Sequence, residues 1–371
     1  MGSEAAYLSA PSSIGPYTVI ARLDVETPGV PLPEERFIAR SQDGARTVLV
    51  CVPLPGADPG RFLAEAEASR YLLGPWASPA TQVSAPGEPA WHARPFLPAV
   101  PLPTALAVHG GPLPEHTVRA LGACLAETLA IAHGQGLAHA GVSPGAVLLA
   151  WDGPRLGCFG AVRTAAPDGE SRYGLPGLES GSLPPEQAAG GRPQPLGDFY
   201  ALGATLAYAA TGHTVPERQE LPASLREIVA GCLARDPAAR PRAAELVRAF
   251  TDPVGPHAAF RTAPVAEVDS SPGNHAGVTP APDWIPGRLT AAIARQSAEI
   301  LAAEIAATEV AAPVPQAAPA PGATAYPGHG HGPAPADTGG QLPGAPHAFP
   351  SAPSPAPAPP SAHPVVPQPS E

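Results

Sequence analysis

The residue types that could do chemistry are restricted in this chain. Lysine commonly acts as a base, forms Schiff bases or binds phosphate. All 21 basic side chains here are arginine, so none of these roles is available to lysine. Four cysteines, at 51, 124, 158 and 232, are placed singly without Cys-x-x-Cys spacing. This pattern predicts a reducing interior, with neither a disulfide framework nor a cysteine-spaced zinc site.

One stretch, Gly136 to Gly160, organises the rest of the chain. Residues 147–149 and 154–156 read as two short strands joined by Asp152-Gly153, a strong hairpin signal. A loop that contains His139 precedes this hairpin, and Cys158-Phe159-Gly160 follows it. The pattern therefore predicts two loops held side by side by a hairpin.

This arrangement resembles the centre of the bacterial serine/threonine protein kinase family. In that family the first loop reads H-R-D-L-x-x-x-N and the second carries D-F-G. On this frame His139, Phe159 and Gly160 are kept. The resemblance implies an α+β bilobal protein kinase-like fold with a small β-rich N-lobe and a larger helical C-lobe.

The positions that carry the family's chemistry are replaced. Gly141 stands where a carboxylate would accept the substrate proton, and Ser143 replaces a lysine that often assists. Ala146 and Cys158 stand where Asn and Asp would hold Mg²⁺, although that ion requires hard oxygen ligands. Cys51 replaces the lysine that positions the phosphates. The resemblance thus implies that no catalytic residue, metal site or cofactor site is intact.

The small-lobe elements show the same loss. Strands are expected at 17–20, 36–40 and 47–52, with a helix from Gly60 to Leu73. The first hairpin retains only Gly29 among several prolines, which lack the N–H groups that would bind phosphate. Glu65 on the helix lacks its usual lysine partner, so we expect a solvated carboxylate. Pro95 lies near the hinge, where a proline removes a donor for adenine.

The framework positions of the family are retained in the C-lobe. Helices are expected at 115–135 and 198–211, with later helices within 221–240 and 243–250. The resemblance implies that Asp198 holds the catalytic loop by its backbone, and that Arg240 pairs with Glu186. The retained framework positions are His139, Phe159, Gly160, Glu186, Asp198, Gly203 and Arg240.

Composition divides the chain into parts. We expect a leader at 1–13 and a kinase-like domain at 14–252, with its lobes at about 14–98 and 99–252. A linker at 253–284, an amphipathic helix at 285–310 and a disordered Pro/Ala-rich tail at 311–371 follow, because the tail has few large apolar groups. The net charge of −11 argues against nucleic-acid binding. No signal peptide or membrane span is expected, and a cytoplasmic location is favoured.

The C-terminal parts leave alternatives open. One side of the helix is expected to carry Leu289, Ile293, Ile300, Leu301 and Ile305. The helix then either docks on the lobe or pairs with a partner helix. The tail is either a ligand for a proline-reading domain, as at Pro364-Val365-Val366-Pro367, or a plain spacer. His329 and His331 are interpreted as incidental rather than as metal ligands.

Selective loss of chemistry with an intact frame favours a catalytically inactive pseudokinase that acts as a binding or scaffold protein in signalling. Its partners would be proteins, including an active kinase. One alternative is an active atypical kinase that uses ATP and Mg²⁺, with Asp152 or Asp24 as base and Arg46 in place of lysine. Another is an adaptor that uses the lobe only as a platform. Cys51 and Cys158 are interpreted as buried fillers of an emptied cleft, with a redox pair as the alternative.

Overall fold

The computed structural model describes residues 11–24, 29–251 and 277–311. Most of the expected leader, the loop residues 25–28, the first part of the linker and the tail with His329 and His331 lie outside the described residues. The chain divides into two compact units, Met1–Pro313 and Val314–Glu371, and the second contains no described residue.

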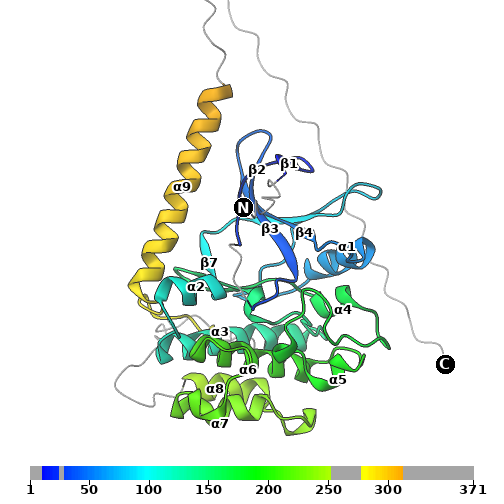
Figure 1. Ribbon diagram of the computed structural model, residues 1–371, viewed down its shortest axis with the longest axis vertical. Helices are drawn as coiled ribbons and strands as arrows, with labels where there is room; N and C mark the ends of the chain where they lie inside the picture. The colour runs from blue at the N-terminus through cyan, green and yellow to red at the C-terminus, as the bar shows by residue number, and fades with distance from the viewer. Residues whose placement is uncertain (1–10, 25–28, 252–276, 312–371) are drawn as a thin grey trace, which may run out of the picture. The chain divides into compact units, whose positions relative to one another are not determined.

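The described residues form strands and helices in the order that the family resemblance implies (Figure 1). The strands are β1 (Ser13–Ile14), β2 (Tyr17–Arg22), β3 (Glu34–Ser41), β4 (Thr47–Pro53), β5 (Gln82–Val83), β6 (His92–Pro95), β7 (Ala99–Pro101), β8 (Val147–Ala150) and β9 (Gly153–Leu156). The helices are α1 (Pro59–Ser69), α2 (Leu102–His109), α3 (Glu115–Gly134), α4 (Ala161–Ala165), α5 (Pro185–Ala188), α6 (Pro195–Thr211), α7 (Ala223–Cys232), α8 (Ala243–Thr251) and α9 (Gly287–Ala311).

Within the described residues, the N-lobe is an antiparallel sheet with strand order β1-β2-β3-β4-β6-β5. In its register Cys51 on β4 lies opposite Arg36 on β3 and opposite His92 on β6. Residues paired across an antiparallel ladder share one face of the sheet. These three side chains therefore lie on the same face, and Figure 1 shows that the sheet stands above the helical lobe.

Helix α1 lies beside this sheet and ends earlier than the sequence indicates. It begins where the side chain of Asp58 accepts a hydrogen bond from the Arg61 N–H, with Pro59 at its first position. It ends at Ser69, so the expected helix to Leu73 is too long by one turn. Leu73 is 60% exposed, because it lies beyond the helix and outside the core.

The C-lobe is built around α3 and α6, whose side chains are almost all buried. Gly203 on α6 allows this packing, since a Cβ there would overlap the Cβ of Cys232 on α7. A second sheet among the described residues, with order β7-β8-β9, joins the segment after β6 to the predicted hairpin. Trp151 and Asp152 form the turn between β8 and β9, one residue earlier than the expected Asp152-Gly153, because Gly153 is the first residue of β9 and pairs with Ala150.

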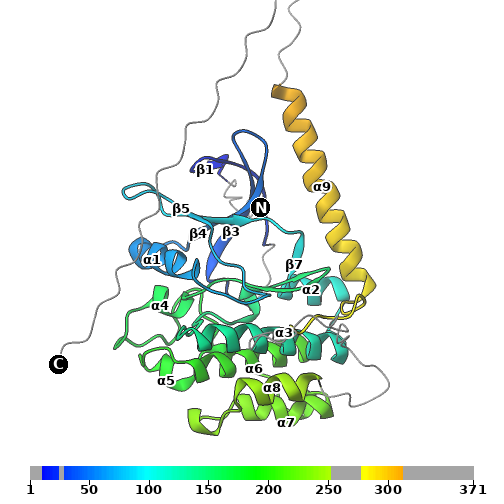
Figure 2. The same ribbon diagram turned by 180° about the vertical axis from the view of Figure 1, so that it is seen from behind.

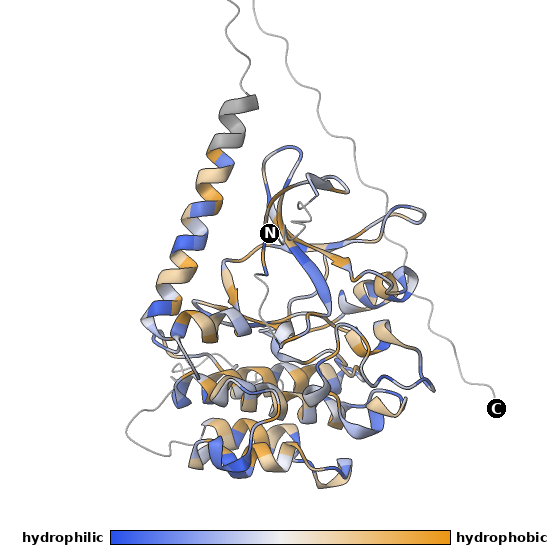
Figure 3. Cartoon of the chain, in the orientation of Figure 1, coloured by the Kyte–Doolittle hydropathy of each residue, from blue (hydrophilic) through white to orange (hydrophobic). Residues whose placement is uncertain are grey.

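Helix α9 packs on the same chain, along β2, β7 and α2, in both views (Figures 1 and 2). Leu289, Ile293 and Ile300 are buried, and hydrophilic residues alternate with them along the helix (Figure 3). The expectation that Leu301 and Ile305 share this side is wrong, because both are exposed. The end of the expected linker is also packed: Trp284 is 1% exposed, and its carbonyl accepts a hydrogen bond from Thr117. The end of the expected linker is therefore packed on the domain, because an indole of this size is stabilised by burial in the core.

Among the described residues, none of the helices combines the length and hydropathy that crossing a membrane requires.

Candidate functional site

The loop before β3 closes the space between the lobes. Val30 is buried, and it belongs to the same apolar cluster as Val142, Ala146 and Cys158. The Pro31 carbonyl oxygen lies so near Gly145 that a Cβ there would be 2.9 Å from it. Gly29 has a left-handed φ of 88° and makes no close contact at its Cβ position. The segment expected to cover phosphates therefore packs directly on the loop expected to be catalytic.

That loop is buried and has no room for the missing carboxylate. Gly141, Ser143 and Ala146 are all buried. A Cβ added at Gly141 would overlap the backbone carbonyl oxygen of Cys158. Because the obstacle is backbone rather than a flexible side chain, any other residue at 141 requires the two loops to separate.

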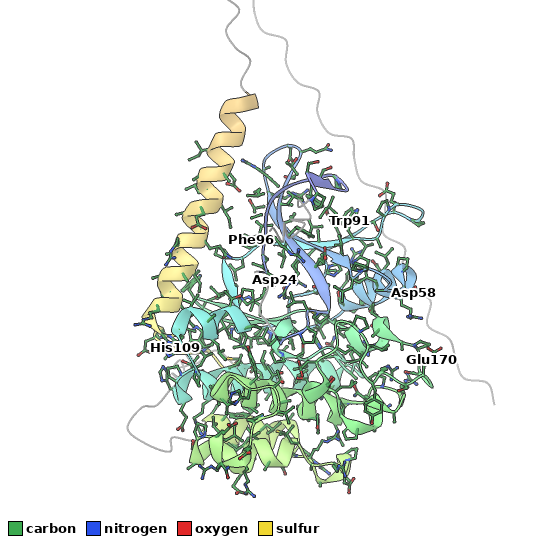
Figure 4. The ribbon with its side chains drawn as sticks, in the orientation of Figure 1. Asp24, Asp58, Trp91, Phe96, His109 and Glu170 are labelled. Carbon is green, nitrogen blue, oxygen red and sulfur yellow. The ribbon has the colours of Figure 1, made fainter. Side chains whose placement is uncertain are left out.

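A buried polar cluster lies beneath the sheet, and we call it the cleft cluster. Its members are Asp24, Glu34, Arg36, Cys51, His92, Arg94 and Cys158. Arg36 donates from Nε to Asp24 Oδ2 at 2.8 Å, and both side chains are buried. Asp24 lies between the sheet and the helical lobe (Figure 4). Arg36 on β3 is therefore paired on the same face of the sheet as Cys51, its neighbour on β4.

Glu34 is the hub of the other half of the cluster. Its Oε2 lies 3.0 Å from His92 Nε2, and its Oε1 lies 3.5 Å from Arg94 Nη2. Cys158 Sγ donates to the same Oε1 at 3.5 Å. Burial alone would raise the pKa of Glu34, but the charges of His92, Arg94 and Arg36 outweigh it and hold that pKa well below its ordinary value.

The surroundings of the two thiols of the cluster favour their protonated form. Burial, followed by the charge of the neighbouring Glu34, raises the pKa of both Cys51 and Cys158. Both are free cysteines, and Cys51 is 0% exposed. They are thus more than apolar fillers, because each lies against charged groups.

The expectation that Glu65 is a solvated charge is wrong. Its carboxylate accepts two hydrogen bonds from Arg163, at 2.8 Å from Nε and 2.7 Å from Nη2. Arg163 lies on α4, which begins directly after Gly160. A Cβ at Gly160 would overlap the Glu65 carboxylate, so glycine permits this approach. An arginine 98 residues away has taken the place of the expected lysine.

The framework positions occupy the places that the resemblance implies. Asp198 accepts hydrogen bonds from the backbone N–H groups of His139 and Ala140, both at 2.7 Å. Arg240 forms a bidentate ion pair with Glu186, with distances of 2.6 and 2.9 Å.

The rings of His139 and Phe159 form an edge-to-face pair between the two loops, with centroids 5.5 Å apart. Ala140 and Cys158 both have left-handed backbones, with φ of 52° and 58°. Non-glycine residues adopt this conformation at a cost of about 1–2 kcal/mol, so the surrounding packing must impose it.

Comparison with known proteins gives the family of this frame. The solved kinase domain of Mycobacterium tuberculosis PknI superposes with a TM-score of 0.51 and 22% identity, over 67% of this chain and 99% of that domain. The described domain has a protein kinase-like fold.

Its relatives in sequence are bacterial serine/threonine protein kinases. A probable serine/threonine-protein kinase of Thermomonospora curvata, PkwA, is 34% identical over 259 residues, which is 64% of this chain and 34% of PkwA. AfsK of Streptomyces griseus is 31% identical over 260 residues, 62% of this chain and 31% of AfsK. The chain thus spans about a third of the length of these relatives. No family model matches the sequence.

In the kinase-like domain the hinge follows β6. Pro95 is the last residue of β6 and lies opposite Val48, so the expected proline is at the start of the hinge. A few residues on, the N–H of Ala99 donates to Gln296 Oε1 on α9 at 3.1 Å. A backbone donor of the hinge region is therefore already bound within the chain.

Sequence reasoning missed Glu34, Arg36, His92 and Arg94. A signal was present: the pairs Glu34-x-Arg36 and His92-x-Arg94 have the period of a strand, so each pair lies on one face. Polar residues at that period are unexpected on the inner face of a kinase-like sheet. The strand order that brings the pairs together is not visible in the sequence.

Proposed function

We propose that this chain is a serine/threonine kinase homologue that transfers no phosphate and acts in signalling by binding other proteins. The observation that carries the proposal is the closed cleft. Val30 and Pro31 pack on the loop that contains Gly141 and Ala146, in the space that phosphates and metal ions would need. Phosphoryl transfer depends on positioning and electrostatic stabilisation in that space.

The charges of the cleft support the same conclusion. Arg36 is neutralised by Asp24, and Arg94 faces Glu34, so neither buried cation is free to hold phosphate. A nucleotide would have to separate these buried ion pairs, which costs several kcal/mol when one partner is left alone. Loss of a general base by itself reduces the rate of transfer about 10²- to 10⁴-fold.

Phosphate transfer from radiolabelled ATP tests the proposal directly. The full chain, incubated with Mg²⁺ or Mn²⁺ and a general protein substrate, is expected to give no labelling above a protein-free control. An active bacterial serine/threonine kinase provides the positive control. Labelling that disappears in Glu34→Gln, and not in the surface variant Glu67→Gln, would show that the cleft is catalytic and overturn the proposal.

An active atypical kinase finds less support in the geometry. Asp24, one suggested base, is paired with Arg36, and Asp152 is paired with Arg155 beside its turn at 2.7 Å. Arg46 is exposed in the turn between β3 and β4, away from Cys51 at the other end of the strand. These pairings and the place of Arg46 favour the inactive homologue over the atypical kinase.

Nucleotide affinity separates a regulated pseudokinase from a simple adaptor. A ligand at about 100 times its Kd stabilises a protein by about 2.7 kcal/mol, which raises the melting temperature by several degrees. We expect no shift with ATP, with or without Mg²⁺. A shift with ATP would mean that the cleft opens, and would favour nucleotide-regulated partner binding over a platform role.

The proposal also covers the binding partners of the chain and its location in the cell. Since α9 is packed on the domain, the Pro-x-x-P segments near 364–367 are the better candidates for partner binding, by a proline-reading domain. A cytoplasmic location is proposed from the cysteine usage. Fluorescence anisotropy of a labelled peptide of residues 358–371 with such domains tests the first point, and a peptide with Pro364 and Pro367 replaced by alanine is the control.

A further inference from the structure

Helix α9 has a second apolar side, away from the one that packs on the domain. Leu301 and Ile305 are large apolar side chains, and they are 57% and 53% exposed. They lie four residues apart, so they are neighbours on the helix surface. Toward the start of the helix the same side continues with three exposed small residues, Ala291, Ala294 and Ala298. We call these five residues the outer stripe.

The spacing of the outer stripe is that of a helix that pairs with another helix. Its members follow one another at intervals of three, four, three and four residues, which are the a and d positions of a heptad repeat. At 3.6 residues per turn this side lies opposite Ile293 and Ile300, which are buried against the domain. In both views α9 lies at the edge of the domain (Figures 1 and 2). The outer stripe therefore faces away from its own domain.

Opposite charges lie beside the outer stripe. Arg295 and Glu299 are both exposed. Within the part of the chain that the structure describes, neither side chain forms an ion pair. A surface that carries one cation and one anion next to an apolar seam can complement a second copy of itself, because a two-fold axis brings each charge to its opposite.

An antiparallel pair of α9 helices matches both the stripe and the charges. When Ala294 of one copy lies opposite Ala298 of the other, Leu301 lies opposite Ala291, so a large side chain meets a small one. The same register brings Arg295 of each copy beside Glu299 of the other. A parallel pair in register would instead place Leu301 on Leu301 and leave the alanines facing one another across a gap, which packed interfaces avoid.

We propose that two copies of this chain associate through the outer stripe of α9 as an antiparallel helix pair. The association goes beyond the proposed function, since neither the cleft nor the tail takes part in it. It is compatible with the docking of α9 on its own domain, because the domain and the second copy use opposite sides of the helix. The seam is only one helix long, whereas standard interfaces bury about 1,200–2,000 Å², so the pairing should be weak and reversible.

Sedimentation equilibrium of the full, reduced chain tests the association. We expect the weight-average mass to rise from one chain toward two as the protein concentration increases through the micromolar range. The double variant Leu301→Glu with Ile305→Glu should stay at one chain, because it places charges inside the seam. Val215→Glu is the matched control. Val215 is 79% exposed and lies outside α9, so this variant should associate as the unchanged chain does.

Exchange of the flanking charges identifies the helix and its direction. Arg295→Glu and Glu299→Arg should each weaken self-association about tenfold, because both ion pairs of the interface become like-charge contacts. A mixture of these two variants should recover the association as a heterodimer, since one copy then carries two anions and the other two cations. The two substitutions combined in one chain should associate as the unchanged chain does.

Three results would overturn the proposal. They are a mass of one chain at every concentration, association that persists in the double variant Leu301→Glu with Ile305→Glu, or a mixture of the charge variants that associates no better than either variant alone. The first measurement needs no substitution. The other two use exposed positions, where a change of side chain leaves the packing of the domain intact.

Discussion

At the scale of single residues, the position of the family's catalytic carboxylate is coupled to the backbone packing. Gly141 occupies the position of the family's catalytic carboxylate, and it also permits the close approach of the Cys158 carbonyl. The replacement is therefore built into the packing of the two loops. A carboxylate introduced at this position alone would meet the Cys158 carbonyl, so the two loops would have to separate to admit it.

Gly141→Ala is expected to destabilise the domain by about 1–3 kcal/mol, the usual cost of overpacking a core. Gly134→Ala is the matched control, since a Cβ at the end of α3 meets nothing within 4 Å. Urea unfolding of the two variants measures the difference. Equal stability of both variants would show that the two loops separate easily. Gly141→Asp should likewise give no phosphate transfer.

His139 predicts a pH dependence of stability. Burial lowers its pKa to about 4 from the ordinary 6.5, so the folded state stays unprotonated where the unfolded state gains a proton. Stability therefore falls as the pH drops below 6.5, by about 2 kcal/mol between pH 7 and pH 5.

The pKa values of Glu34 and Glu186 are lowered from their ordinary 4.5, so these groups change stability mainly below that pH, outside the window from pH 7 to pH 5. Chemical denaturation at pH 7 and pH 5 measures the stability lost between the two pH values. His139→Phe should lose less than the unchanged chain, whereas His116→Gln should lose as much. An unchanged slope in His139→Phe would contradict the assignment.

At the scale of elements, α9 is a structural part of the kinase-like domain. Ile300 is 8% exposed, whereas its neighbour Leu301 is 57% exposed. Arg40 donates to the Glu304 carbonyl, and Trp284 Nε1 donates to the Trp151 carbonyl at 3.1 Å. The helix is thus attached to the N-lobe sheet, and the segment that leads into it is attached to the hairpin of the C-lobe. Phe96 and His109 lie on the same side of the domain as the helix (Figure 4).

Ile300→Ala should cost about 2–4 kcal/mol, since it removes a buried side chain and leaves a cavity. Leu301→Ala changes the same kind of side chain one residue on and should cost less than about 0.5 kcal/mol. Thermal unfolding of the pair measures this contrast. If Leu301→Ala lowers the stability more than Ile300→Ala does, α9 packs on the domain with a different face.

At the scale of the whole molecule, α9 links the lobes through the hinge region. The Ala99 N–H has its partner in Gln296, 197 residues further along the chain. A helix bonded to both lobes and to the segment between them should restrict the hinge motion that kinases use to admit nucleotide. The restricted hinge and the filled cleft should both oppose nucleotide binding.

Gln296→Leu should speed amide exchange at Ala99 by about tenfold or more, because the lost bond lowers the free energy of local opening. Arg295→Leu, an exposed change on the same helix, should leave that amide protected. Hydrogen exchange followed by mass spectrometry of peptides covering 96–102 measures the rate. Equal protection in both variants would mean that α9 does not restrain the hinge.

The sequence by itself determined the frame, because the frame depends on local signals. Asp152-Gly153 indicates the turn to within one residue, the spacing of Phe62 and Ala66 indicates a helix face, and strand patterns place β2 to β4 within a few residues. The family pattern predicted that Asp198 binds the backbone of the loop at His139 and that Arg240 pairs with Glu186. The structure contains both interactions.

Only the tertiary structure decided what fills the cleft. The cleft cluster joins residues 12 to 124 positions apart, so its contacts depend on strand order and loop packing. The partner of Glu65 came from α4, and α9 docked on the domain that precedes it. A period of two tells which face a strand residue occupies, but not which residues meet it there. That information resides in the fold, since neighbours in space are set by how strands and helices pack.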